Sequence, residues 1–108
     1  MKTPLLVAVL FCLGLATACF ADNSQDIWTK QCVKCHGTDG KGQTPMGKKL
    51  HLLDFTDAKV KAELKDDEMF KAIKEGRKTK EGNSLMKPAQ DATDEDITAL
   101  VKLIRGLN

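Results

Sequence analysis

The sequence predicts one small all-α domain with long loops. Apolar residues recur at the spacing of one helix face near the C-terminus, from Ile97 to Leu107. Gly76 and Gly106 stand where the expected helices should end, and glycine is the common residue just past a helix. No segment alternates apolar and polar residues convincingly with period two, so no strand is expected.

The first residues form a secretory signal. Lys2 supplies a positive start, an apolar run extends from Leu5 to Ala16, and small residues follow it. This run is shorter than the roughly 20 residues that a membrane-spanning helix needs. We expect cleavage after Ala21 and a soluble periplasmic product. Two alternatives remain: cleavage after Ala18, which would leave Cys19 as a weak lipid-anchor site, and an uncleaved anchor.

The first element of the mature domain is predicted to be a helix over Ser24–Cys35. Trp28, Cys32 and Cys35 are spaced i, i+4 and i+7, which places their side chains on one face of a regular helix. The glycine-rich segment Gly37–Gly42 then forms a turn-rich loop. Because no strand precedes this loop, it is not a phosphate-binding loop.

Three further helical segments follow. Ala58–Leu64 is expected to form a short helical turn, and Asp67–Glu75 a helix capped by Asp66. The C-terminal helix is predicted to start after Thr93, whose hydroxyl can cap it, with Asp96 at the capping-box position.

The mature domain, residues 22–108, has little material for a core. Its aromatic residues are Trp28, Phe55 and Phe70, and the chain contains no Tyr. One of the 17 basic residues, Lys2, lies in the signal, so basic residues exceed the 15 acidic ones by a single charge. This near balance excludes a strong nucleic-acid footprint.

The motif Cys32-Val33-Lys34-Cys35-His36 carries the chemistry. C-x-x-C-H is typical of covalent heme attachment: each thiol can add to one heme vinyl group, and the adjacent imidazole can bind the iron. The alternatives are a redox dithiol and half a zinc site. A dithiol would not need His36, and a zinc site takes four ligands, whereas the mature chain adds only His51. We therefore expect one heme c bound through Cys32 and Cys35.

His36 is expected to bind the iron through Nε2. Its Nδ1 then needs an acceptor, commonly a backbone carbonyl. We expect that carbonyl to come from Gln43-Thr44-Pro45.

The second axial ligand must come from the remaining methionines and histidine of the mature domain: Met46, Met69, Met86 and His51. Met69 suits core packing in its helix, and Met46 lies in a loop that must wrap the proximal side. Met86 follows a polar loop and precedes Pro88. The proline stiffens the segment that carries Met86, which we call the strap. We expect Met86 to be the distal ligand, with His51, another Met or an open site as alternatives.

With these motifs the chain resembles the bacterial class I monoheme cytochromes c. The segments that carry the resemblance are Cys32–Gly37, Asp39–Gly42, Gly47–Leu50, Asp54–Asp57, Phe70–Gly76, Met86–Pro88 and Thr93–Ile97. The resemblance implies a small all-α fold in which the N- and C-terminal helices cross and loops wrap one covalently bound heme. It also implies that Cys32 and Cys35 hold the heme, with His36 proximal and Met86 distal. The chain departs from the family in having Lys87 between Met86 and the proline.

The function that follows is one-electron transfer between extracytoplasmic redox partner proteins, without catalysis and without a small-molecule substrate. Scattered lysines usually mean only a solvated surface. The alternative is a lysine-bearing face near the heme edge that steers acidic partners, with Lys34, Lys48, Lys49 and Lys87 as candidates. The alternatives are a heme sensor or peroxidase-like protein with an open distal site, a dithiol oxidoreductase, and a subunit of a larger respiratory complex.

Overall fold

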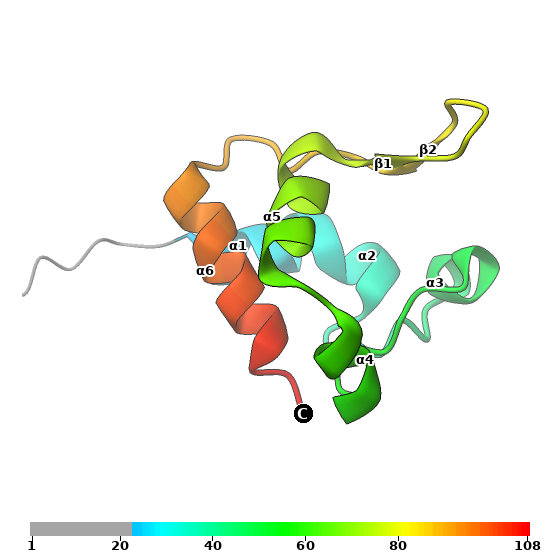
Figure 1. Cartoon of the computed structure of the whole chain (residues 1–108), viewed down its shortest axis with the longest axis horizontal. Coiled ribbons are helices and arrows are strands. Elements are labelled where there is room, and N and C mark those ends of the chain that lie inside the picture. The colour runs from blue at the N-terminus through cyan, green and yellow to red at the C-terminus, as the bar shows by residue number, and fades with distance from the viewer. Residues whose placement is uncertain (1–22) are drawn as a thin grey trace, which may run out of the picture.

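The computed structural model describes residues 23–108, so the expected signal sequence, its cleavage positions and Cys19 lie outside the described residues. The all-α prediction is confirmed: helices dominate the structure (Figure 1). In chain order the elements are α1 (Ser24–Ile27), the π-helical turn η1 (Trp28–Cys32), α2 (Val33–His36), α3 (Pro45–Leu50), α4 (Ala58–Glu63), α5 (Asp66–Glu75), β1 (Arg77–Lys78), β2 (Ser84–Met86) and α6 (Asp94–Arg105). None of the helices described is long and apolar enough to span a bilayer.

The N-terminal helix is continuous but not regular. α1, η1 and α2 follow one another directly, and the N–H of Val33 donates to the carbonyl of Trp28 five residues back. A π turn holds an extra residue, so regular α-helical spacing does not extend across it. Trp28 is buried, and the half-buried Cys32 packs against the same core, while Cys35 is also half-buried. The π turn interrupts the regular helical spacing from which a common face of Trp28, Cys32 and Cys35 was predicted.

The C-terminal helix α6 lies across the start of the N-terminal helix and packs on α5 (Figure 1). Its predicted capping box is confirmed: the N–H of Asp96 donates to Thr93 Oγ1 at 3.1 Å, and the N–H of Thr93 donates to Asp96 Oδ2 at 3.0 Å. Asp96 Oδ1 also accepts from the N–H of Asn23 at 3.2 Å. One buried carboxylate thus caps α6 and fixes the start of α1 beside it.

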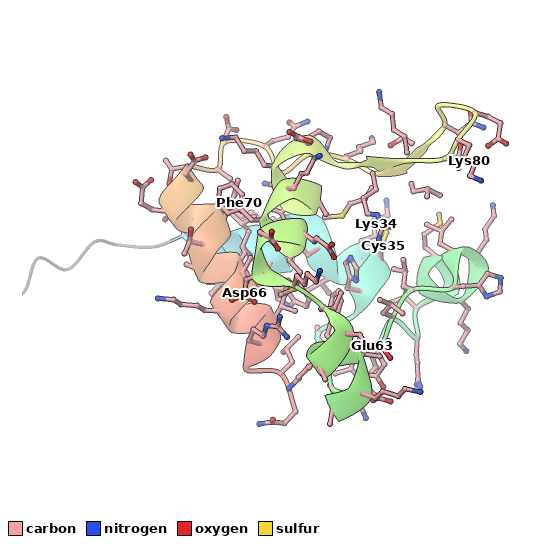
Figure 2. The ribbon with its side chains drawn as sticks, in the orientation of Figure 1. Lys34, Cys35, Glu63, Asp66, Phe70 and Lys80 are labelled. Atoms are coloured by element: carbon pink, nitrogen blue, oxygen red, sulfur yellow. The ribbon has the colours of Figure 1, made fainter. Side chains whose placement is uncertain are left out.

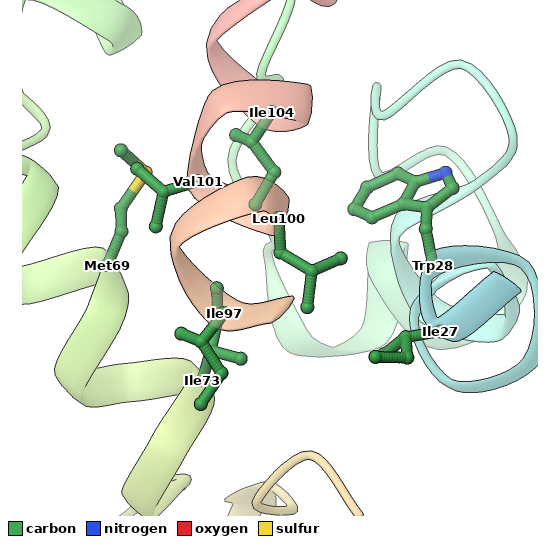
Figure 3. Packing of buried hydrophobic residues seen from close by; sticks show 8 residues of the cluster. All are labelled: Ile27, Trp28, Met69, Ile73, Ile97, Leu100, Val101 and Ile104. Atoms are coloured by element: carbon green, nitrogen blue, oxygen red, sulfur yellow. The ribbon is translucent and has the colours of Figure 1, made fainter. Parts of the chain in front are cut away.

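The core lies between α1, η1, α5 and α6 (Figure 3). Leu100 is the most buried member, with 1% of its surface exposed, and Met69 packs here as its sequence context predicts. The eight buried apolar residues are Ile27, Trp28, Met69, Ile73, Ile97, Leu100, Val101 and Ile104. None of them comes from the segment 37–64.

Two elements were not predicted from the sequence. α3 begins at Pro45 after the N-cap Thr44, whose hydroxyl accepts from the N–H of Gly47 at 2.9 Å. The polar loop after α5 closes a two-stranded antiparallel hairpin in which Arg77 pairs with Met86. Both elements are too short to show a hydrophobic period. The start of α5 also differs, because Lys65 rather than Asp66 is its N-cap.

Candidate functional site

The two cysteines lie where η1 meets α2, and both sulfurs are free of disulfide bonds. Burial, with a smaller contribution from Cys35, raises the pKa of the Cys32 thiol to about 11. Redox-active dithiols instead depend on a thiol whose pKa is lowered, because the thiolate is the nucleophile. The environment of Cys32 therefore disfavours the dithiol oxidoreductase alternative.

His36 is the last residue of α2, and its ring lies between two aromatic side chains. The ring centroid is 6.0 Å from that of Trp28 and 5.0 Å from that of Phe55, with interplanar angles of 27° and 25°. Burial lowers the pKa of His36, which favours the neutral imidazole that binds metals. Within the described part of the chain, its Nδ1 is buried without a hydrogen-bond partner.

The expected carbonyl acceptor for Nδ1 is not found in Gln43-Thr44-Pro45. This stretch contacts the main chain of the motif instead. The hydroxyl of Thr44 donates to the carbonyl of Cys35 at 2.5 Å, and the N–H of Gly42 donates to the carbonyl of His36 at 2.8 Å. The loop therefore satisfies carbonyls at the end of α2, where a helix has no internal donors left.

Gly47 is required by close packing against the motif. A Cβ at this position would lie 2.2 Å from the carbonyl oxygen of Gly42 and 2.8 Å from that of Cys35. Real Cβ atoms do not approach backbone oxygens so closely. A side chain at position 47 would consequently push α3 away from the end of α2.

A turn over Asp54–Asp57 positions Phe55. The sequence contains this motif but does not show that it brings Phe55 to the ring of His36. Asp54 Oδ1 accepts from the hydroxyl of Thr56 at 2.6 Å and from its N–H at 2.8 Å, and these bonds lower the pKa of Asp54. The N–H of Phe55 donates to the carbonyl of Gly40 at 2.9 Å. These bonds fix Phe55 against the ring of His36. In the sequence, the motif Asp54–Asp57 was the feature that could have indicated this turn.

Met86 ends β2 and is half-buried against the core. The strap after it follows the end of α5 closely: a Cβ on Gly76 would lie 2.4 Å from the carbonyl oxygen of Met86 and 2.9 Å from Pro88. The N–H of Ala89 donates to the carbonyl of Ile73 at 2.9 Å. The strap is thus held along α5.

The other candidate ligands lie in different surroundings. Met69 belongs to the core, and 41% of the surface of Met46 is exposed on α3. His51 is the exposed C-cap of α3, with a φ of 55°. Across residues 23–108, no group of three or more His, Cys, Asp or Glu side chains gathers as a metal-binding cluster.

The sequence model of the cytochrome c family matches residues 21–108. The chain belongs to the cytochrome c family. Among solved structures it is similar to the KustC0563 c-type cytochrome, with 32% identity and a TM-score of 0.65 over 79% of this chain and 96% of that one. A single-residue mutant of Kustc0563 gives 32% identity and a TM-score of 0.64 over 80% of this chain and 99% of that one. No curated protein matches the sequence.

Membership of this family establishes the general chemistry. The protein is a class I monoheme c-type cytochrome, its cofactor is a covalently bound heme c, and its function is heme-based electron transfer. Domains of this family are electron carriers in general and are typically extracytoplasmic.

The residues of this cytochrome fit the heme. Two half-buried thiols precede a half-buried imidazole whose pKa is lowered, which is the donor set that C-x-x-C-H attachment needs. Nδ1 of His36 has no partner among the described residues, but iron is expected at Nε2, so the fit rests on the two thiols free of disulfide bonds and on the imidazole that its lowered pKa keeps neutral. The end of α2 with Lys34 and Cys35 appears in Figure 2 between the hairpin and α3.

Proposed function

We propose that this cytochrome is a periplasmic one-electron carrier. Cys32 and Cys35 hold the heme through two thioethers, His36 is the proximal ligand of the iron, and Met86 is the distal ligand. When bound, the heme supplies a reversible ferrous–ferric couple.

The half-buried imidazole beside the two thiols is the observation that carries this proposal. His36 directly follows the two thiols on one helix end, and Trp28 and Phe55 cover its ring. These aromatic side chains hold the ring in place and shield part of it from water. An apolar surrounding disfavours the more highly charged oxidised state, and a methionine ligand acts in the same direction, so both raise the reduction potential.

The test is the optical spectrum of the holoprotein, matured with covalent heme attachment and recorded oxidised and reduced. A low-spin spectrum with a thioether-to-ferric-iron charge-transfer band is expected. A high-spin spectrum, or ready binding of carbon monoxide, would instead support the sensor or peroxidase-like alternative. Protein without heme would contradict the proposal altogether.

We further infer that the redox partners present acidic surfaces. The four lysines named from the sequence are exposed, as are further basic residues of the hairpin: Arg77, Lys78 and Lys80. Figure 2 shows Lys34 and Lys80 toward the hairpin and α3, away from α6. The first turn of α6 carries two exposed acids instead, Asp94 and Glu95, and Asp94 pairs with Lys74 at 2.9 Å. This separation of charge orients an approaching acidic partner.

Two small redox reagents of opposite charge test this inference. Added salt should slow oxidation of the reduced protein by ferricyanide and accelerate oxidation by a cationic cobalt complex, because salt screens exposed charges. Lys87→Glu should slow the ferricyanide reaction several-fold, while the control Lys102→Glu on α6 should not. Equal salt dependence for the two reagents would contradict the inference.

A further inference from the structure

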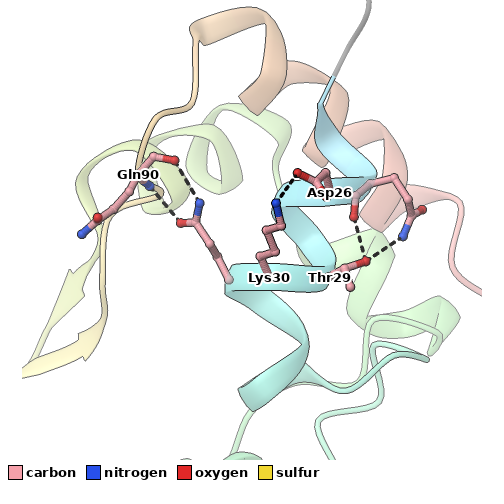
Figure 4. A network of polar contacts seen from close by, with 6 residues as sticks. Asp26, Thr29, Lys30 and Gln90 are labelled. Atoms are coloured by element: carbon pink, nitrogen blue, oxygen red, sulfur yellow. Dashed lines mark hydrogen bonds and ion pairs between the residues drawn. The ribbon is translucent and has the colours of Figure 1, made fainter.

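Gln31 connects the heme-binding helix with the segment that follows Met86. Its Nε2 donates to the carbonyl of Gln90 at 2.9 Å, and its Oε1 accepts from the N–H of Gln90 at 2.9 Å (Figure 4). The two residues are 59 positions apart. A side-chain amide has both a donor and an acceptor, so it can pair with one backbone unit as a neighbouring strand would.

The position of this pair gives it a role at the heme. Gln31 immediately precedes Cys32, and Gln90 lies four residues after Met86. The strap is otherwise held along α5, through the close contact at Gly76 and the bond from Ala89. The pair adds a direct link from the strap to the helix that carries the proximal ligand.

The local helix geometry supports the same role. Gln31 lies within the π turn η1, which ends at Cys32. Such turns within helices occur frequently at functional sites, because the extra residue changes the direction of the side chains. Here the π turn contains Gln31, the residue whose side chain bonds to the strap.

We propose that Gln31 is a positioning residue that holds the Met86 strap closed over the heme. This proposal rests on the proposed distal role of Met86. Loss of the amide releases Gln90, and the strap then opens more often, so that an external ligand replaces Met86 more easily. The global fold is little affected, because both bonds are exposed at the surface.

The test uses ferric holoprotein and imidazole as the external ligand. Gln31→Ala should increase the apparent affinity for imidazole about fivefold, as expected for the loss of two exposed hydrogen bonds. Gln31→Glu keeps the acceptor but places a carboxylate oxygen against the carbonyl of Gln90, so it should increase the affinity at least as much as Gln31→Ala. Gln90→Ala is the matched control, because Gln90 contributes only main-chain atoms, and its affinity should equal that of the wild type.

Amide hydrogen exchange provides a second measurement that needs no added ligand. The N–H of Gln90 should exchange faster in Gln31→Ala, while the N–H of Ile97 in α6 should not change. Unchanged imidazole affinity and unchanged exchange at Gln90 would overturn the role of Gln31.

Met86→Ala, measured in parallel, separates this proposal from the one on which it rests. If Met86→Ala abolishes the thioether band but Gln31→Ala behaves as wild type, only the positioning role fails. If Met86→Ala retains the band, Met86 is not the distal ligand and both proposals fail.

Discussion

The residues of the site differ in how far the sequence alone identifies their roles. Cys32, Cys35 and His36 are identified by their order in the chain, because heme attachment requires that order. Phe55 acquires its role only through contact: it covers the ring of His36 although 19 positions separate them in the sequence. Met86 is an intermediate case. The polar loop and Pro88 predict that Met86 lies on a strap, but they do not predict where its thioether points.

Removing the thioether at position 86 tests the distal ligand. In Met86→Ala the heme should stay attached through the cysteines, but the ferric form should become high-spin or take an external ligand, and the charge-transfer band should disappear. Optical spectra and reduction potentials of the purified holoprotein measure this.

Met46→Ala is the matched control, because Met46 is exposed on α3 and should leave the spectrum unchanged. A low-spin spectrum and an unchanged potential in Met86→Ala would transfer the distal role to His51 or to another methionine.

Among the elements, the crossing of the N- and C-terminal helices depends on one carboxylate. Asp96 completes the capping box of α6 and accepts a bond from Asn23 at the start of α1. Its bonds to the N–H groups of Thr93 and Asn23 lower its pKa below the ordinary value of 3.8. Because the folded protein then favours the ionised carboxylate, this group stabilises the fold above its ordinary pKa.

The stabilisation from Asp96 should be lost as the pH falls through its lowered folded-state pKa. Asp96→Asn should therefore lower the free energy of unfolding at pH 7, and the difference from wild type should shrink as the pH falls below 3.8. Denaturant titrations at several pH values measure this. Glu95→Gln removes an exposed acid from the same helical turn and should show no comparable loss.

The hydroxyl of Thr93 is the other half of the same cap. Thr93→Ala should reduce the free energy of unfolding by about 1 kcal/mol at pH 7, as is typical when an N-cap is removed. Thr93→Ser keeps the hydroxyl and should retain most of the stability. An equal loss in both variants would show that the cap bond is not the cause.

At the scale of the whole molecule, the core is confined to one side. All of the buried apolar residues described belong to α1, η1, α5 and α6. The segment 37–64 is held to them by hydrogen bonds from Arg105 of α6 to the carbonyls of Lys61 and Leu64 and by the half-buried Phe55 and Leu64. A small domain with so limited a core depends on its cofactor for stability.

We therefore expect the heme-free chain to be largely unfolded. A ligand that binds the native state but not the unfolded state stabilises the fold. Because the heme is attached covalently, this stabilisation is permanent. Near-UV circular dichroism and a thermal scan of heme-free protein should show little tertiary signal and no cooperative transition, in contrast to the holoprotein. A native-like near-UV spectrum without heme would contradict this.

Much of the architecture was predictable because it depends on local patterns. The capping box at Thr93 and the helix face from Ile97 to Ile104 are readable directly, since caps and helix periods involve residues a few positions apart. α3 was not predicted because it is a single short helix that contains Gly47. The hairpin was not predicted because each of its strands is only a few residues long. The π turn has no sequence signature.

The sequence by itself determined the family's chemistry and the helical class, because attachment of heme needs two thiols and an imidazole in a fixed local order. Only the tertiary structure decided what surrounds them. It placed Trp28 and Phe55 on the ring of His36, directed Thr44 to the main chain of the motif instead of to Nδ1, and joined Gln31 to Gln90. These are contacts between distant segments, and their geometry depends on how all the helices pack together rather than on any neighbouring residues.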